Sequence, residues 1–306
     1  MVDTGIDLNH PDLQGRIWQN LFEIPNNSVD EDGNGCIDDV NGCAFVTNPS
    51  PGCSGAVNGF VRDDIGHGTF VSGIIAANGN NGQGMVGVAR GVTVLSVKVL
   101  DCQGRGESVA LAQGILYSAK RGAAVINISL GGTNDSVIVR EAVRAAHDQN
   151  GALIVAASGN SGQEGVSYPA RYPGVLAVGA ASIANPDKRA KFSSTGPQVS
   201  VVAVGENIVG TVPQSSCGGG FLPCVGGPYA TGSGTSFAAP QVSGLVALIL
   251  SRSRGLKPDA IIATIEEAAT AVPAGDRPNW AGAGRINMAE SLRPAYQLGA
   301  PGLTRN

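Results

Sequence analysis

The sequence predicts an α/β fold in which a parallel sheet lies between two layers of helices. Short apolar runs alternate along the chain with segments of helical period, which is typical of a parallel sheet with helices on both faces. Hydrophobic residues make up 42% of the 306, enough for a large core. Charged residues make up 14%, compared with roughly 25% in an average globular protein.

Strands and helices are expected in alternation from the first third of the chain onward. The expected strands are apolar runs at residues 92–100, 123–132, 151–160, 173–182 and 198–205. The expected amphipathic helices between them lie at residues 107–123 and 136–150. Because functional groups in parallel sheets gather at the carboxyl ends of the strands, the turns that follow these runs are the first places to search for a site.

Two further helices are expected in the C-terminal third. The helix that begins near Ser236 is apolar on nearly every face, so it should be central and buried. Pro240 lies near its start, where a missing N–H is tolerated. A second helix, at residues 258–269, has Pro258 in its first turn.

Composition argues against several classes of partner. The formal net charge is −4 and the isoelectric point is near 5.4, which disfavours nucleic acid and anionic membranes. No apolar run approaches the roughly 20 residues that a membrane helix needs. No G-x-G-x-x-G or G-x-x-x-x-G-K-[ST] segment follows an expected strand, which disfavours a nucleotide-dependent enzyme. We expect a monomer without nucleic-acid or membrane partners.

Six cysteines, an even number, are compatible with three disulfides. Two pairs are near neighbours inside Gly-rich loops, which are the least costly loops to close, and the remaining two cysteines could form a third pair. Such bonds would indicate a secreted protein, whereas six reduced thiols would indicate a cytosolic one. The expected pairs are Cys36–Cys43, Cys217–Cys224 and Cys53–Cys102.

Three polar side chains stand in Gly-flanked turns at the ends of expected elements. Asp3 lies in VDTGID, His67 in GHGTFVSGIIAA and Ser236 in GTSFAAP. A Ser hydroxyl is a poor nucleophile unless a base takes its proton, and an imidazole base needs an acid to fix its tautomer. Of the three histidines, His10 and His147 fit surface or capping roles, whereas His67 lies between glycines at a helix start.

These three segments, in the order Asp, His, Ser, resemble the signature segments of the subtilisin-like serine proteases, the subtilase or peptidase S8 family. The resemblance implies the three-layer sandwich of the subtilisin type and serine endopeptidase activity. It makes Ser236 the nucleophile, His67 the general base and then acid, and Asp3 the orienting carboxylate. Asn160, in AASGNSG, matches the oxyanion residue. Taken singly, these residues also fit ordinary turn and capping roles.

The resemblance also implies substrate contacts and a specificity. Two Gly-containing edges would pair with an extended peptide, and a small residue at the floor of the primary pocket would favour large uncharged P1 side chains. The implied edge residues are Ser129, Leu130, Gly131 and Gly132 on one side and Gly104, Arg105 and Gly106 on the other, with Ser167 at the floor of the pocket.

An acidic loop, NSVDEDGNGCIDD, predicts a calcium site. Its D-x-D-x-N-G pattern matches the first half of a calcium loop, but the twelfth position is Asn41 and not Glu. A solvated acidic turn is the alternative. The candidate ligands are Asp30, Asp32, Asn34, Asp38 and Asp39.

The N-terminus departs from the family pattern. In the family the acid closes a central strand that further residues precede, whereas only Met1 and Val2 precede Asp3 here. We therefore expect an N-terminally truncated peptidase domain at residues 1–293, with a first strand too short to fix Asp3 firmly, and a C-terminal tail at 294–306. The alternative to a secreted endopeptidase is a truncated chain of impaired activity that keeps the fold and the calcium loop.

Overall fold

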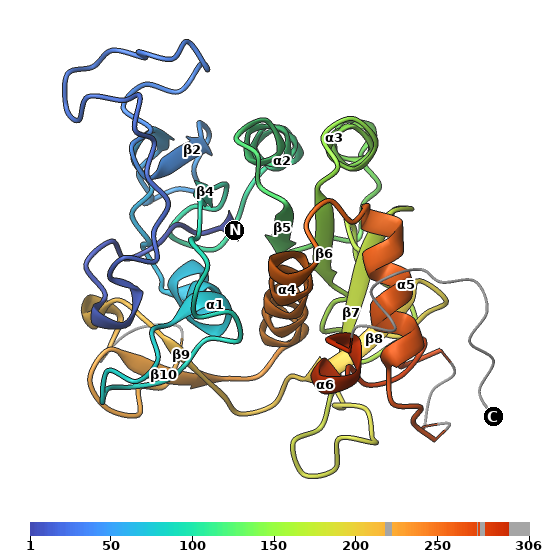
Figure 1. The fold of residues 1–306 in the computed structure, drawn as a ribbon. Coiled ribbons are helices and arrows are strands. Elements are labelled where there is room, and N and C mark those ends of the chain that lie inside the picture. The colour runs from blue at the N-terminus through green and yellow to red at the C-terminus, as the bar shows by residue number, and fades with distance from the viewer. Residues whose placement is uncertain (218–221, 274, 276–278, 294–306) are drawn as a thin grey trace.

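A computed structural model describes residues 1–217, 222–273, 275 and 279–293. Its centre is an eight-stranded sheet with the strand order β3-β2-β4-β1-β5-β6-β7-β8, parallel except for β3 at one edge (Figure 1). The strands are β1 (Val2–Asp3), β2 (Gly42–Val46), β3 (Ala56–Asn58), β4 (Ser96–Lys98), β5 (Val125–Ile128), β6 (Leu153–Ala157), β7 (Val175–Ala181) and β8 (Val199–Val204).

Helices cover both faces of the sheet, which confirms the predicted α/β sandwich. On one face α2 (Ser108–Lys120) and α3 (Val137–Asp148) lie side by side. On the other face α4 (Thr235–Arg252) contacts β5 to β8 and α1 (His67–Ala76). The α5 helix (Pro258–Ala268) and the short α6 (Met288–Ser291) complete this layer (Figure 1). None of the helices in the described residues is long and apolar enough to cross a membrane.

The strands are apolar without alternation because both faces of the sheet are buried. In β6 the side chains of Ile154 and Ala156 belong to the core under α2 and α3, whereas Leu153 and Val155 belong to the core around α4. Successive strand residues point to opposite faces, so one continuous apolar run fills two cores. The expected strand at 151–160 is therefore correct in type, and only its central residues pair.

The structure contains strands that the sequence did not predict. The strands β2 and β3 form an antiparallel pair at one edge of the sheet. A separate antiparallel pair consists of β9 (Ile208–Thr211) and β10 (Tyr229–Gly232), and its β9 strand packs against α1. Short pairs such as these carry little periodicity, which explains why they were missed. The predicted tail at 294–306 lies outside the described residues.

Short as it is, β1 is held firmly in the middle of the sheet. Val2 pairs with Val97 of β4 and with Ile128 of β5. The buried amino group of Met1 donates a 2.9 Å hydrogen bond to the carbonyl oxygen of Leu95. Asp3 at the end of β1 is fully buried. The expectation that so short a strand would leave Asp3 loosely held was wrong, because β1 is paired with both neighbouring strands, β4 and β5.

All six cysteines are paired as predicted. The structure contains the disulfides Cys36–Cys43, Cys53–Cys102 and Cys217–Cys224, and no free cysteine. The bond between Cys53 and Cys102 closes the longest loop, 49 residues in sequence. Of the three bonds, this one should restrict the unfolded chain most and so stabilise the folded protein most, because the loss of entropy grows with loop length.

Thiol titration of the denatured, unreduced protein should therefore detect no free thiol. Titration after reduction under denaturing conditions should detect all six thiols. Loss of the disulfides should also lower the midpoint of thermal unfolding, since each lost cross-link lowers the free energy of unfolding by roughly 2–5 kcal/mol. Two or more free thiols in the unreduced sample would contradict the pairing.

Candidate active site

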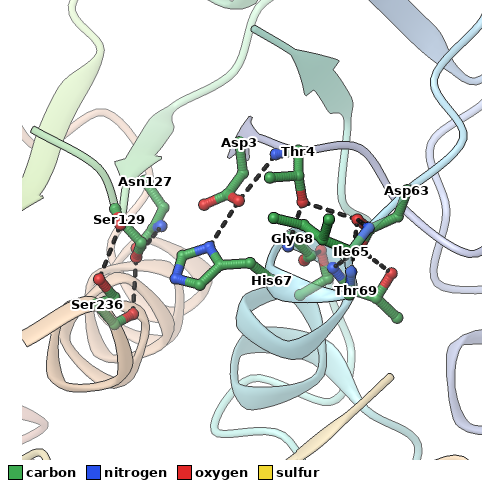
Figure 2. A network of polar contacts seen from close by, with 12 residues as sticks. Asp3, Thr4, Asp63, Ile65, His67, Gly68, Thr69, Asn127, Ser129 and Ser236 are labelled. Carbon is green, nitrogen blue, oxygen red and sulfur yellow. Dashed lines mark hydrogen bonds and ion pairs between the residues drawn. The ribbon is translucent and has the colours of Figure 1, made fainter. Parts of the chain in front are cut away.

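The first two candidate residues meet directly. The Asp3 carboxylate at the end of β1 forms a 2.7 Å hydrogen bond with Nδ1 of His67 at the start of α1. The main-chain N–H of Thr4 also donates to the same carboxylate oxygen, at 2.8 Å. These bonds fix the orientation of the ring, and they leave its other nitrogen on the side of Ser236 (Figure 2).

A second buried carboxylate, Asp63, builds the turn that presents His67. Its Oδ1 accepts hydrogen bonds from the Thr4 hydroxyl and from the N–H groups of Ile65 and Gly66, at 2.8 to 3.2 Å. Its Oδ2 accepts bonds from the N–H and the hydroxyl of Thr69, at 2.8 and 2.6 Å. Asp63 thus joins the chain after β1 to the first turn of α1 (Figure 2).

The backbone contact between these segments explains why glycine follows the imidazole. The Gly68 N–H donates to the Thr4 hydroxyl at 2.8 Å. A Cβ at Gly68 would lie 2.2 Å from the carbonyl oxygen of Gly5, a distance that no real side chain tolerates. Only a glycine lets α1 approach the end of β1 this closely.

The environment of His67 favours its charged form. Burial alone would lower the pKa of the imidazole, but the charge of Asp3, its hydrogen bond and the more distant charge of Asp63 outweigh burial and raise the pKa above the ordinary value. His67 therefore binds a proton more tightly than a free imidazole does.

Ser236 lies in the first turn of α4, where helix N–H groups have no intrahelical partner. Its hydroxyl donates a 2.9 Å bond to the carbonyl oxygen of Ser129, which follows β5. The next residue, Phe237, brings its ring to 5.6 Å from the centroid of the His67 imidazole. The start of α4 and the start of α1 therefore converge at the carboxyl end of β1 and β5.

Pro240 contributes to this convergence. It lies in the second turn of α4, beyond the first-turn position where a missing N–H is tolerated, and it cannot donate to the carbonyl oxygen of Ser236. That oxygen instead accepts a 2.8 Å bond from the Ser129 hydroxyl. The proline thus frees a helix carbonyl that ties α4 to the segment after β5.

The side-chain amide of Asn160, after β6, is held by the first residue of α4. Its Oδ1 accepts two 2.9 Å bonds from Thr235, one from the N–H and one from the hydroxyl. Both bonds engage the carbonyl oxygen, and the NH2 group lies near the start of α4, where a Cβ at Gly234 would come within 3.5 Å of it. Thr235 is fully buried, so the residue before Ser236 sets the orientation of Asn160.

The two predicted substrate edges face each other across a cleft of about 510 Å³. Leu130, Gly131 and Gly132 line one side, and Gly104, Arg105 and Gly106 line the other. Within the described residues, the backbone N–H and C=O groups of Gly106, Leu130 and Gly131 have no intramolecular partner. Unpaired groups on facing edges are what an added peptide strand needs.

Ser167 lies between two glycine-bearing segments, next to Gly131 of the cleft and to Gly159 after β6. A Cβ at Gly131 would come within 3.1 Å of the Ser167 Cβ, and one at Gly159 would come within 2.4 Å of its hydroxyl. The Ser167 N–H is bonded to the carbonyl oxygen of Ser158, at 2.8 Å. Its side chain is therefore close to the strand end that carries Asn160.

A separate cluster of acidic side chains lies in the loop before β2. One carboxylate oxygen from each of Glu23, Asp32 and Asp39 lies within 4.8 Å of the other two. Asp39 is fully buried and Glu23 is 7% exposed. The Glu23 Oε2 has no hydrogen-bond partner among the described residues. Burial and the nearby charges of Asp39 and Glu31 raise the pKa of Glu23.

The surrounding residues only partly neutralise this cluster. Asp32 forms an ion pair with Arg121, and Asn20 donates to both Asp32 and Asp39, at 3.0 and 2.6 Å. Three carboxylates thus face one guanidinium. A buried oxygen without a donor, among converging carboxylates, fits a hard divalent cation.

The five ligands predicted from the sequence divide into two groups. Asp32 and Asp39 belong to the cluster, and the Asn34 amide nitrogen bonds to Asp39 at 3.0 Å. Asp30 instead accepts bonds from the N–H groups of Asn34 and Gly35, which makes it a turn former. Asp38 accepts from the N–H groups of Asn27 and Ser28, at 3.1 and 3.0 Å, so the structure does not bring it into the cluster.

Comparison with known proteins places this geometry in a family. The subtilase family model matches residues 1–284. The chain belongs to the subtilase family. It is 35% identical over 293 residues to thermitase of Thermoactinomyces vulgaris, and the match covers 96% of this chain and 87% of thermitase. It is 38% identical over 232 residues to subtilisin BL of Lederbergia lenta, which covers 76% and 79% of the two chains.

A solved structure agrees with this assignment. A protease of Pseudoalteromonas arctica superposes with a TM-score of 0.75 at 26% identity, over 95% of this chain and 87% of that one. The subtilase described here is therefore a subtilisin-like serine endopeptidase that acts on protein substrates, as the sequence motifs predicted.

Sequence reasoning missed three residues that the structure places at or near these sites. Asp63 precedes the HGT segment and Thr235 precedes Ser236, so their positions beside motifs were the available signal. Glu23 lies outside the D-x-D-x-N-G pattern, in a segment without regular structure. Nothing in the sequence indicates that this carboxylate folds back against Asp32 and Asp39.

Proposed function

We propose that this subtilase cleaves peptide bonds through Ser236, with His67 as general base and acid and Asp3 as the orienting carboxylate. The observation that carries the proposal is the 2.7 Å bond between Asp3 and Nδ1 of His67, beside the helix start that holds Ser236. This bond holds the proton on Nδ1 and leaves the other ring nitrogen as the acceptor.

In the acylation step the Ser236 hydroxyl turns from the Ser129 carbonyl toward His67. The imidazole takes the proton, and the Ser236 Oγ forms a bond to the carbonyl carbon of the peptide. Protonated His67 then gives the proton to the leaving amine as the C–N bond breaks. In the second step His67 takes a proton from water, which attacks the carbonyl carbon of the resulting ester. Protonated His67 then gives the proton to the Ser236 oxygen as the ester bond breaks, which releases the acid product and restores the hydroxyl.

The oxyanion that forms in each step would be bound by two donors. The Asn160 NH2 group is oriented by Thr235, and the Ser236 main-chain N–H belongs to the open first turn of α4. The positive end of the helix dipole adds to this stabilisation. Both donors are fixed before the reaction, so charge development requires little reorganisation.

The facing edges at 104–106 and 129–132 would bind an extended peptide as added β-strands, and Ser167 would lie at the floor of the primary pocket. A small neutral side chain there leaves room for a large uncharged P1 residue. A cleavage profile dominated by Arg or Asp at P1 would contradict this specificity.

Glu23, Asp32 and Asp39 would hold a structural calcium ion. The ion would supply the positive charge that Arg121 alone does not, and it would satisfy the buried Oε2 of Glu23. The cluster lies in the loop before β2, so the ion would stabilise the fold and take no part in the chemistry.

Three disulfides support secretion into an oxidising compartment. A catalytic site assembled within one chain supports function as a monomer, with proteins or peptides as substrates. Detection of the protein only in the cytosol, or of an oligomer at working concentration, would contradict these assignments.

Replacement of Ser236 by Ala should abolish turnover of casein or a chromogenic peptide, with a loss of at least about 10³-fold in kcat. Asn160→Ala should lose about 10²–10³-fold, the magnitude established for this donor in subtilisin. The exposed Ser251 at the other end of α4 offers a matched control, and Ser251→Ala should keep full activity.

A fluorophosphonate should label the wild type and not Ser236→Ala. A wild type that is folded but neither labelled nor active would indicate an impaired subtilisin fold.

The pH profile should report the raised pKa of His67. Activity requires the neutral imidazole, so kcat/KM should fall as the pH drops through this pKa, with a midpoint above about 6.5. Asp63→Asn removes a negative charge that favours the imidazolium, so its midpoint should move to lower pH, whatever its effect on the maximal rate. The exposed Glu141→Gln should leave the midpoint unchanged. An unchanged midpoint in Asp63→Asn would contradict the electrostatic role of Asp63.

Addition of Ca²⁺ should stabilise the chelated protein, the metal-free form that remains after a chelator has removed bound metal. At a concentration 100 times the dissociation constant, a single site adds about 2.7 kcal/mol to the free energy of unfolding. Glu23→Gln should remove most of this gain, whereas Glu141→Gln should keep it. Calorimetry that detects no heat when Ca²⁺ is added to the chelated wild type would rule the site out.

A further inference from the structure

The substrate edge at 104–106 belongs to a loop that another loop holds in place. This edge loop (residues 101–107) contacts a brace loop (residues 48–53), which lies about fifty residues earlier in the chain. The inference that follows rests on the proposed function, because it concerns the edge at which a peptide substrate would pair.

Asp101 is the centre of the contact. Its side chain is buried, with the residue only 2% exposed. Its Oδ1 accepts hydrogen bonds from the N–H groups of Gln103 and Arg105, at 2.9 and 3.0 Å. The Asp101 N–H in turn donates to the carbonyl oxygen of Arg105, at 2.8 Å. The carboxylate therefore closes the edge loop into a rigid turn.

The second oxygen of the same carboxylate reaches the brace loop. Oδ2 accepts a 2.7 Å bond from the N–H of Ser50. Burial alone would raise the pKa of Asp101, but the bonds from Ser50, Arg105 and Gln103 lower it to about 2. Asp101 is therefore ionised near neutral pH, and its bonds to N–H groups are charge-assisted.

Three further links join the two loops. The disulfide between Cys53 and Cys102 adds a covalent tether directly beside Asp101. The Gln103 side chain donates to the carbonyl oxygen of Pro51 at 3.0 Å. The remaining link is a 2.8 Å hydrogen bond from the Asn48 amide to the Glu107 carboxylate. The brace loop is therefore attached on both sides of the 104–106 edge.

The braced edge forms one wall of the cleft, opposite Leu130 and Gly131. The backbone groups of Gly106 have no partner within the described residues, so their position is set by the loop that carries them. A peptide that pairs with both edges needs a fixed spacing between them, and a wall that moves would cost ordering entropy on binding.

We propose that Asp101 is a positioning residue, and that together with the Cys53–Cys102 disulfide it fixes the 104–106 edge at the spacing at which an extended peptide substrate binds. It acts on substrate residues distant from the scissile bond, because the edge lines the cleft opposite Leu130 and Gly131, whereas Ser236 bonds to Ser129 and Asn160 to Thr235. Binding of long substrates therefore depends on it, and the chemical step does not.

The test compares a tetrapeptide anilide with an ester of its P1 residue alone, in the full chain. Asp101→Asn places an NH2 group against N–H donors and removes at least one acceptor. Its KM for the tetrapeptide should rise about tenfold, as expected for the loss of a hydrogen bond to a charged acceptor. Its kcat for the tetrapeptide and its kcat/KM for the ester should stay within about twofold of the wild type.

The double variant Cys53→Ser/Cys102→Ser provides an independent measurement if Asp101→Asn does not fold. It should raise the KM for the tetrapeptide and leave ester hydrolysis unchanged. The matched control is Cys36→Ser/Cys43→Ser, which removes a disulfide that does not touch the edge loop and should show no selective change in KM. Unfolding temperatures measured beside the kinetics place all assays below the transition.

Two results would overturn the positioning role: a KM for the tetrapeptide that is unchanged in both test variants, or equal losses for the tetrapeptide and the ester. The second result would mean that the brace serves only stability. A wild type that hydrolyses neither substrate would instead refute the proposed function, and the inference would fall with it. A loss selective for the long substrate supports both.

Discussion

The arrangement of the active site depends on keeping the end of β1 against the start of α1. Asp3 and His67 lie 64 residues apart in sequence and belong to separate elements. Their hydrogen bond persists because Asp63 bonds simultaneously to Thr4 and to the first turn of α1. The buried Lys98 adds a bond from its amine to the Thr4 carbonyl oxygen, at 2.6 Å, and an ion pair with Asp64.

Buried charges in this region are therefore compensated in pairs and by backbone donors, as burial requires. Each compensating bond also fixes geometry. Asp63 has five donors and no freedom to turn, so the imidazole it supports has little freedom either. The same negative charge favours the protonated imidazole, so one carboxylate both positions the His67 ring and contributes to its raised pKa.

A second constraint is the start of α4, where three functions share the first two helical turns. Thr235 orients Asn160, Ser236 presents its hydroxyl and N–H, and Pro240 frees the carbonyl that Ser129 binds. A shift of these two turns would displace all of them together. The rest of α4 packs against the sheet through apolar residues such as Val242, Leu245 and Ile249, which opposes such a shift.

The sequence by itself determined the class of fold and the chemistry. Continuous apolar runs specify strands buried on both faces, and Asp3, His67 and Ser236 lie in motifs specific enough to name the family and the reaction. The cysteine pairs also followed from spacing and elimination. Only the tertiary structure decided the supporting contacts: the turn built by Asp63, the approach of Glu23 to Asp32 and Asp39, and the brace on Asp101. These contacts are made through single hydrogen bonds and carboxylate clusters, several of them between segments far apart in sequence. Such contacts leave no periodic pattern, because they arise only after the chain has packed.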